Sequence, residues 1–147
     1  MNKILLIVVF LLFSSFSFSQ DGRSMKPIIN DVNDVVSAVE SRGAEVVKIE
    51  FDIVSTDVKT SYRVLSSGWN YSIGVIGDYR SEDMDVEVYK QKSDGNYELV
   101  VSDTKVSSYA VVYVTPTEST WYKFVIKCYK FKPGYTSCHY GLIVVHE

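Results

Sequence analysis

Five carboxylates form the densest cluster of potential metal ligands in the chain: Asp78, Glu82, Asp83, Asp85 and Glu87. Calcium binds about six to eight oxygen atoms, often carboxylates that project from one loop. Asp78, Glu82 and Asp83 are placed to form such a loop, so calcium is the one cofactor that the sequence suggests. Asp85 and Glu87 alternate with apolar residues, which is typical of the solvated side of a strand. That alternative stays open because the D-x-D-x-D-G spacing is missing.

The two histidines, His139 and His146, are the other candidates for chemistry, and both lie in the last predicted strand. A zinc site needs further ligands at suitable spacing, and a catalytic triad needs a nucleophile beside an imidazole. The sequence contains no G-x-S-x-G motif, and no predicted helix follows Gly74 and Gly77 to hold a phosphate. We therefore expect surface histidines and predict that the chain is not an enzyme. A small secreted hydrolase or inhibitor is the alternative.

The first residues carry the pattern of a secretory signal peptide. Lys3 precedes an apolar run over residues 4–13, and small residues at 17 and 19 mark a cleavage site. We predict a signal peptide over 1–19, a flexible leader over 20–27 and one domain over 28–147. A membrane anchor is the alternative, but the apolar run is shorter than the roughly 20 residues of a membrane span. The protein is expected to be secreted or periplasmic.

The only two cysteines, Cys128 and Cys138, are predicted to form one disulfide, because exported proteins fold in an oxidising compartment. Two free buried thiols are the alternative. The net charge of −3 and the absence of a dense basic segment speak against a nucleic-acid partner.

The elements that must position these residues are mostly strands. Residues 28–41 form the only helical candidate, since Val32, Val35, Val36 and Val39 share one helical face; Asn30 or Asp31 is expected to cap its start and Gly43 its end. Beyond residue 45 the apolar period is two, which predicts strands over 47–53, 59–65, 69–75, 84–88, 97–102, 109–115, 121–131 and 138–146. Eight short strands without interleaved helices predict an all-β fold, an antiparallel jelly-roll-like β-sandwich.

The last two strands are predicted to form a hairpin in which Cys128 lies opposite Cys138. That register places both cysteines on one buried face with Phe124, Ile126, Tyr140 and Leu142. The opposite face then carries a possible binding surface, which consists of Trp121, Lys123, Lys127 and Tyr129. An ordinary solvated face, or one covered by the N-terminal helix, is the alternative.

Three segments in the second half carry a family pattern: MDVEVYKQKSDGNYELV, YAVVYVTPTESTWYKFVIK and HYGLIVV. An acidic strand followed by a D-G hairpin, and a closing Y-x-L-x-V strand, resemble the bacterial pre-peptidase C-terminal domain. Tyr71 and Gly77-Asp78 fit the preceding family segment. The chain departs from the pattern at Ser119-Thr120, where the family has glycine, and in its cysteine pair and N-terminal helix. The resemblance implies a β-sandwich without catalytic residues, found beside secreted peptidases, with calcium bound in some relatives.

Taken together, these features predict a secreted non-catalytic binding or adhesion module. Its partner is expected to be an extracellular or periplasmic protein or glycan. Calcium is the only cofactor that the sequence suggests, and no membrane span is expected after signal cleavage.

Overall fold

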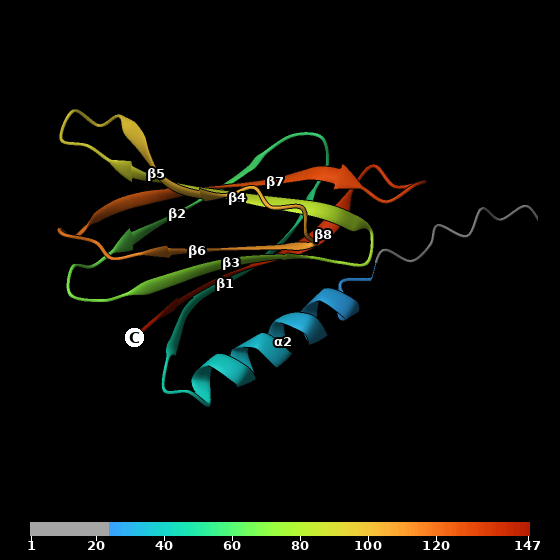
Figure 1. Ribbon diagram of the computed structural model, residues 1–147, viewed down its shortest axis with the longest axis horizontal. Coiled ribbons are helices and arrows are strands. Elements are labelled where there is room, and N and C mark those ends of the chain that lie inside the picture. Colours follow the sequence, from blue (N-terminus) through green and yellow to red (C-terminus); the bar gives the residue numbers. More distant parts are fainter. Residues whose placement is uncertain (1–23) are drawn as a thin grey trace, which may run out of the picture.

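The computed structural model describes residues 24–147, so the predicted signal peptide and the first half of the predicted leader lie outside the described residues. Eight strands form two four-stranded antiparallel sheets, with the orders β1-β8-β3-β6 and β2-β7-β4-β5 (Figure 1). This confirms the predicted β-sandwich. The elements are α2 (Lys26–Glu40), β1 (Glu45–Val54), β2 (Lys59–Leu65), β3 (Tyr71–Gly77), β4 (Ser81–Gln91), β5 (Tyr97–Asp103), β6 (Tyr109–Val114), β7 (Thr120–Phe131) and β8 (Cys138–His146).

One apolar core fills the space between the two sheets. Alternate residues of each strand point inward, and Ile73, Val86, Phe124 and Leu142 are among those with no solvent exposure. The outward residues of β6 and β7 alternate with these buried positions, as a half-buried strand requires.

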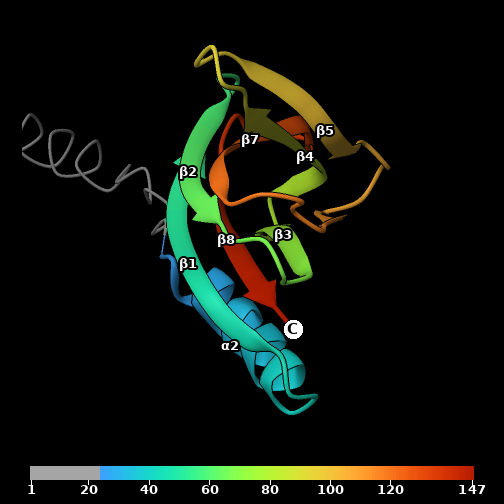
Figure 2. The ribbon, with the colours of Figure 1, turned by 90° about the vertical axis from the view of Figure 1, so that its left-hand side faces the viewer.

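Helix α2 packs on the outer face of the β1-β8-β3-β6 sheet, over β8, β1 and β3, as the end-on view shows (Figure 2). The predicted apolar stripe is confirmed: Ile28 and Val32 are fully buried and pack against Ile143 and Val145 of β8. The close approach requires a glycine, because a Cβ on Gly141 would clash with the Val32 side chain. The described part of the chain holds no helix long and apolar enough to cross a membrane.

The predicted start of the helix is wrong by two residues. Lys26 and Pro27, expected in the flexible leader, already belong to α2, and proline in the first turn loses no hydrogen bond. Asn30 and Asp31 consequently lie inside the helix and cap nothing. The start at Met25 has no side-chain cap, whereas Gly43 adopts a positive φ of 89° just beyond the helix end.

The predicted terminal hairpin is also wrong. Strand β7 pairs with β2 and β4, whereas β8 pairs with β1 and β3, so the connection at 132–137 crosses from one sheet to the other. The inward and outward assignment of β7 is nevertheless correct, because alternation fixes the two faces of a strand without naming its neighbour. The outward side of β8, in contrast, lies in the other sheet, partly beneath α2.

Candidate binding face

The outer face of the β2-β7-β4-β5 sheet carries a row of large side chains that crosses all four strands. Tyr62 of β2 lies opposite Lys123 of β7, Lys123 lies opposite Tyr89 of β4, and Tyr89 lies opposite Leu99 of β5. Tyr62 is 47% exposed and Leu99 is 53% exposed. We call this row, together with its neighbours Val64, Trp121 and Tyr97, the aromatic end of the face.

Contacts between side chains order the aromatic end. The rings of Tyr62 and Tyr97 meet edge to face with their centroids 6.1 Å apart. The Lys123 Nζ atom lies 4.4 Å from the centre of the Tyr89 ring and 5.1 Å from that of Tyr97. An ammonium over an aromatic face is attracted by the ring quadrupole, so Lys123 is held between two tyrosines. Trp121, opposite Val64, is 49% exposed.

The other end of the same face is charged. Asp85 lies opposite Lys127, and the Lys127 Nζ atom sits 4.8 Å above the Tyr129 ring. Burial and the nearby Asp83 carboxylate raise the pKa of Asp85, although Lys127 opposes the effect. The Tyr89 hydroxyl donates a 2.5 Å hydrogen bond to Glu87, which raises the pKa of the phenol.

All four residues of the predicted binding surface lie on this face. Trp121 and Tyr129 are exposed, while Lys123 and Lys127 are half-buried under their contacts with tyrosine rings. The tyrosines of β2, β4 and β5 were not predicted to be part of this face. The residue spacing within one strand does not indicate which strands pair with it.

The predicted calcium residues do not form a three-ligand cluster in the described part of the chain. Glu82 binds Lys130 at 2.5 Å, and Asp83 is buried, where it accepts a hydrogen bond from the Ser107 backbone. The Asp78 carboxylate forms a separate ion pair with Arg80. This geometry does not support the calcium site, since each carboxylate faces its own partner.

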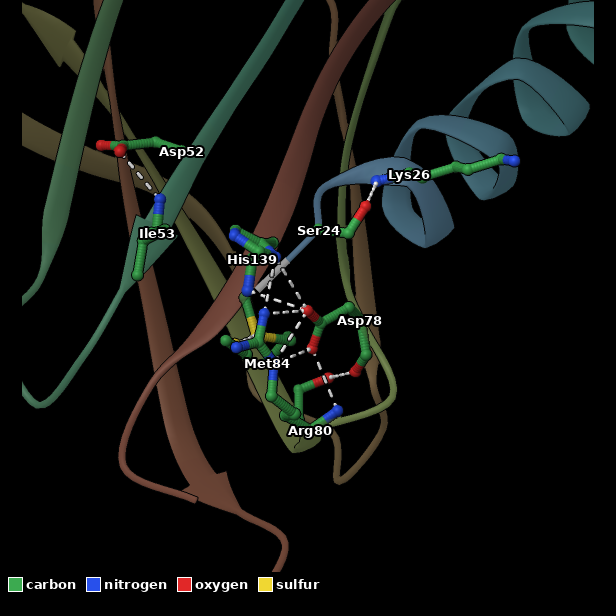
Figure 3. Close-up of polar contacts among 10 residues, drawn as sticks. Ser24, Lys26, Asp52, Ile53, Asp78, Arg80, Met84 and His139 are labelled. Carbon is green, nitrogen blue, oxygen red and sulfur yellow. Dashed lines mark hydrogen bonds and ion pairs between the residues drawn. The ribbon is translucent and has the colours of Figure 1, made fainter. Parts of the chain in front are cut away.

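A buried ion pair between Asp78 and Arg80 lies in the turn from β3 to β4, and a hydrogen bond from the His139 backbone joins it to the start of β8 (Figure 3). Asp78 accepts hydrogen bonds from the Arg80 guanidinium, from the Arg80 backbone at 3.0 Å and from the His139 backbone at 3.1 Å. Burial alone would raise the pKa of Asp78, but these donors outweigh it and lower the pKa. The Asp78 and Arg80 side chains are only 1% and 5% exposed.

The prediction of surface histidines is wrong for His139, which is 2% exposed. Its Nδ1 atom lies 2.6 Å from the Arg80 guanidinium, which places the imidazole inside the ion-pair cluster. His146 lies at the end of β8, where its ring stacks on Trp69 at 4.2 Å and its Nε2 atom is 3.1 Å from Glu45. Among the described contacts, neither imidazole bonds a hydroxyl or a thiol.

Both cysteines point into the core and are present as free thiols. They come from opposite sheets, because Cys128 is on β7 and Cys138 begins β8. Burial raises the pKa of each thiol, and each thiol also influences the pKa of the other. The predicted disulfide is not formed here; it stays a prediction, now as a link between the two sheets instead of a link across a hairpin.

Comparison with known proteins supports the fold and does not assign a family. No family model and no curated protein matches the chain. The Aeromonas hydrophila PliG protein, a periplasmic inhibitor of g-type lysozyme, is a similar solved structure, with 10% identity, 72% of this chain and 90% of that chain covered, and a TM-score of 0.51. The copper-binding surface protein CorA of Methylomicrobium album BG8 gives 10% identity, 65% and 91% coverage, and a TM-score of 0.54.

A pre-peptidase C-terminal domain is also among the similar structures. The domain from the Bacillus anthracis collagenase is 14% identical, with 65% of this chain and 87% of that chain covered and a TM-score of 0.46. At 10% identity, the similarity to PliG and CorA shows a shared fold alone. No family model supports the resemblance seen in the sequence.

Proposed function

We propose that the chain is a secreted or periplasmic, non-catalytic module that binds a protein or glycan through the aromatic end of its open sheet face. The observation that carries this proposal is the contrast between the two outer faces: α2 covers the middle of one of them, whereas the other exposes Tyr62, Leu99 and Trp121 on one surface that crosses all four strands. Contiguous exposed apolar and aromatic residues mark interaction sites on soluble proteins.

The chemistry of the face suits recognition. Tyrosine and tryptophan provide a large contact area with few rotatable bonds, and such residues dominate the binding energy of many interfaces. Lys123 adds a positive charge at the centre of the aromatic end, held in place by Tyr89 and Tyr97. The lysozyme inhibitor and the copper-binding protein, which share the fold, also act by binding, and they support a binding role for this scaffold.

The experiment compares the purified protein with a Tyr62→Ala/Trp121→Ala variant on glycan and protein arrays. We expect at least one ligand whose affinity falls about tenfold or more in the variant, because loss of aromatic anchors costs roughly 1–2 kcal/mol or more each. Tyr113→Ala is the matched control, since Tyr113 is 73% exposed on β6 in the other sheet. Ligands that bind both variants like the wild type, or no ligand at all, would count against the proposal.

A further inference from the structure

The outer face of the β1-β8-β3-β6 sheet contains a recess beside α2 that the helix leaves open. The helix packs chiefly on β8, β1 and β3, and the outward residues Tyr109, Val111 and Tyr113 of the β6 edge stay exposed. Two hollows of about 320 and 470 Å³ lie there, and both are lined by Val35, Gly74 and Val111. Because they share these residues, they form one groove between α2 and β6. The sizes fall in the range of small-molecule sites.

Gly74 in the floor of the groove has no packing reason to be glycine. A Cβ at Gly141 would clash with Val32, and one at Gly77 would clash with Ser81, so close packing explains both of those residues. A Cβ at Gly74 would meet only the Val111 side chain, at an ordinary 3.9 Å. Gly74 has no positive φ, and neither of its strand pairings contains a bulge.

Glycine inside a strand weakens it, and apart from bulges and bends it marks places where a ligand or a backbone approaches closely. With the bulge and the strained backbone excluded, close approach of a ligand is the explanation that fits Gly74. The missing side chain keeps the groove deep at its midpoint, where its two halves join.

The walls determine what chemistry would fit. Around Gly74 the half of the groove toward the start of α2 is apolar, with Ile76, Tyr109 and Ile143 among its lining residues. Asp31 and Asp34 stand on the helix rim of this half, and neither makes an ion pair with any residue that the structure describes. The recess therefore combines an apolar floor with two negative charges at one end, while Arg42 and Glu147, of opposite charge, line its other end.

We propose that this groove binds an amphiphilic cation, a molecule with an extended alkyl chain and an ammonium group that sits beside Asp31 and Asp34. A peptide backbone would bury its N–H and C=O groups against apolar walls without partners, which is costly. An alkyl chain has no such groups. The groove lies on the other sheet from the aromatic end, so a test of the groove is independent of the proposed function.

The two tryptophans allow the groove to be tested separately from the aromatic end. Trp69 stacks on His146, which lines the groove, whereas Trp121 lies on the open face. In a Trp121→Phe variant, Trp69 is the single reporter of ligand entry, in addition to calorimetry. The probes are dodecyltrimethylammonium, dodecyl maltoside and dodecyl sulfate, all below their micelle concentrations, with choline as the cation that lacks a chain.

We expect the ammonium probe to bind about three- to tenfold more tightly than the sulfate probe, since two exposed carboxylates act through screening solvent. Asp31→Asn/Asp34→Asn should remove this preference and keep a weaker, charge-independent binding. Choline should not bind. Equal binding of the cationic and anionic probes to the wild type would overturn the assignment of a cation.

Gly74→Val is the blocking variant, because its side chain would fill the groove at an unstrained strand position. It should keep or raise the melting temperature and weaken all three dodecyl probes by about tenfold or more. Val111→Phe, which fills the same groove from β6, gives a second blocking variant in case the first one fails to fold. Unchanged binding in a folded blocking variant would overturn the site. If a lysine- and leucine-rich peptide binds the groove and none of the alkyl probes does, the proposal of an amphiphilic cation as the ligand would be overturned.

Discussion

The outer faces of the two sheets are built from similar strands but meet different surroundings. On β8, eight of nine residues are buried, because the core covers one side and α2 and neighbouring side chains cover the other. On β7, buried residues alternate with exposed or half-buried ones such as Trp121 and Lys127. The helix turns one outer face into a second core and leaves the other face exposed, where we propose that a partner binds. The predictions below test that division.

The largest difference is expected for charge pairs on the two sheets. Asp78→Asn removes one partner of the buried pair at the end of β3 and leaves Arg80 without its counter-charge. Breaking such a pair costs about 3–5 kcal/mol of unfolding free energy. Glu118→Gln, which breaks the exposed Lys90–Glu118 pair beside the open sheet, should leave the stability unchanged within error. Urea unfolding of both variants measures the contrast, and equal losses would contradict it.

The same ion pair predicts a loss of stability in acid. The pKa of Asp78 is lower in the folded protein than its ordinary value of 3.8, so the folded state favours the carboxylate. The resulting stabilisation is fully present above that ordinary value and is lost as the pH falls below it, through the lowered folded pKa. Unfolding curves between about pH 6 and pH 2 should show this loss, and the slope should be smaller in Asp78→Asn.

A second contrast concerns apolar side chains of the two outer faces. Ile28 of α2 is fully buried against the covered sheet, whereas Leu99 lies 53% exposed on the open face. Ile28→Ala should cost about 2–5 kcal/mol through lost burial and a cavity. Leu99→Ala should change the stability by no more than about 0.5 kcal/mol. Thermal and urea unfolding would show whether the open face is truly dispensable for folding; a large loss in Leu99→Ala would contradict the division.

Part of this difference between the two outer faces can be predicted from the sequence. Alternation in β7 correctly placed Phe124, Ile126 and Cys128 inward and Lys123 and Lys127 outward. The run GLIVV in β8 does not alternate, which is the pattern of a strand covered on both sides. The predicted hairpin rested on the cysteine pair and the short connection, and neither of these determines which sheet β8 joins. Helix α2 was predicted from its valine stripe, but no local pattern showed which sheet it would cover.

The site could be predicted only where one strand supplied it. The four residues of β7 were identified from their spacing, whereas Tyr62, Tyr89 and Tyr97 joined them through pairing between strands distant in sequence. The buried Asp78 cluster was missed for a related reason. Its carboxylate was counted as a solvated ligand because the position of His139 beside it depends on the pairing of β3 with β8.

The cysteine pair offers a covalent test of how the two sheets are joined. If Cys128 and Cys138 are oxidised in the exported protein, the disulfide links the open sheet to the covered one and should add up to about 3 kcal/mol of stability. Intact mass should then be lower by two hydrogens, and a reductant should lower the melting temperature. In Cys128→Ala/Cys138→Ala the reductant should have no effect. Alkylation of two thiols after unfolding without reductant would contradict the disulfide.

The smallest effect compares two glycines on one outer face, one under the helix and one beside it. Gly141→Ala would drive its Cβ into Val32 and should cost about 1–3 kcal/mol, because the stiff, buried valine can move only with α2. In Gly74→Ala the new Cβ meets only an ordinary contact. The substitution should leave the free energy of unfolding unchanged or raise it by up to about 1 kcal/mol, because alanine lowers the conformational entropy of the unfolded chain. Urea unfolding separates the outcomes. Equal costs at both positions would mean that α2 restricts the whole sheet, including the groove, and that the uncovered strip at β6 is not free to receive a ligand.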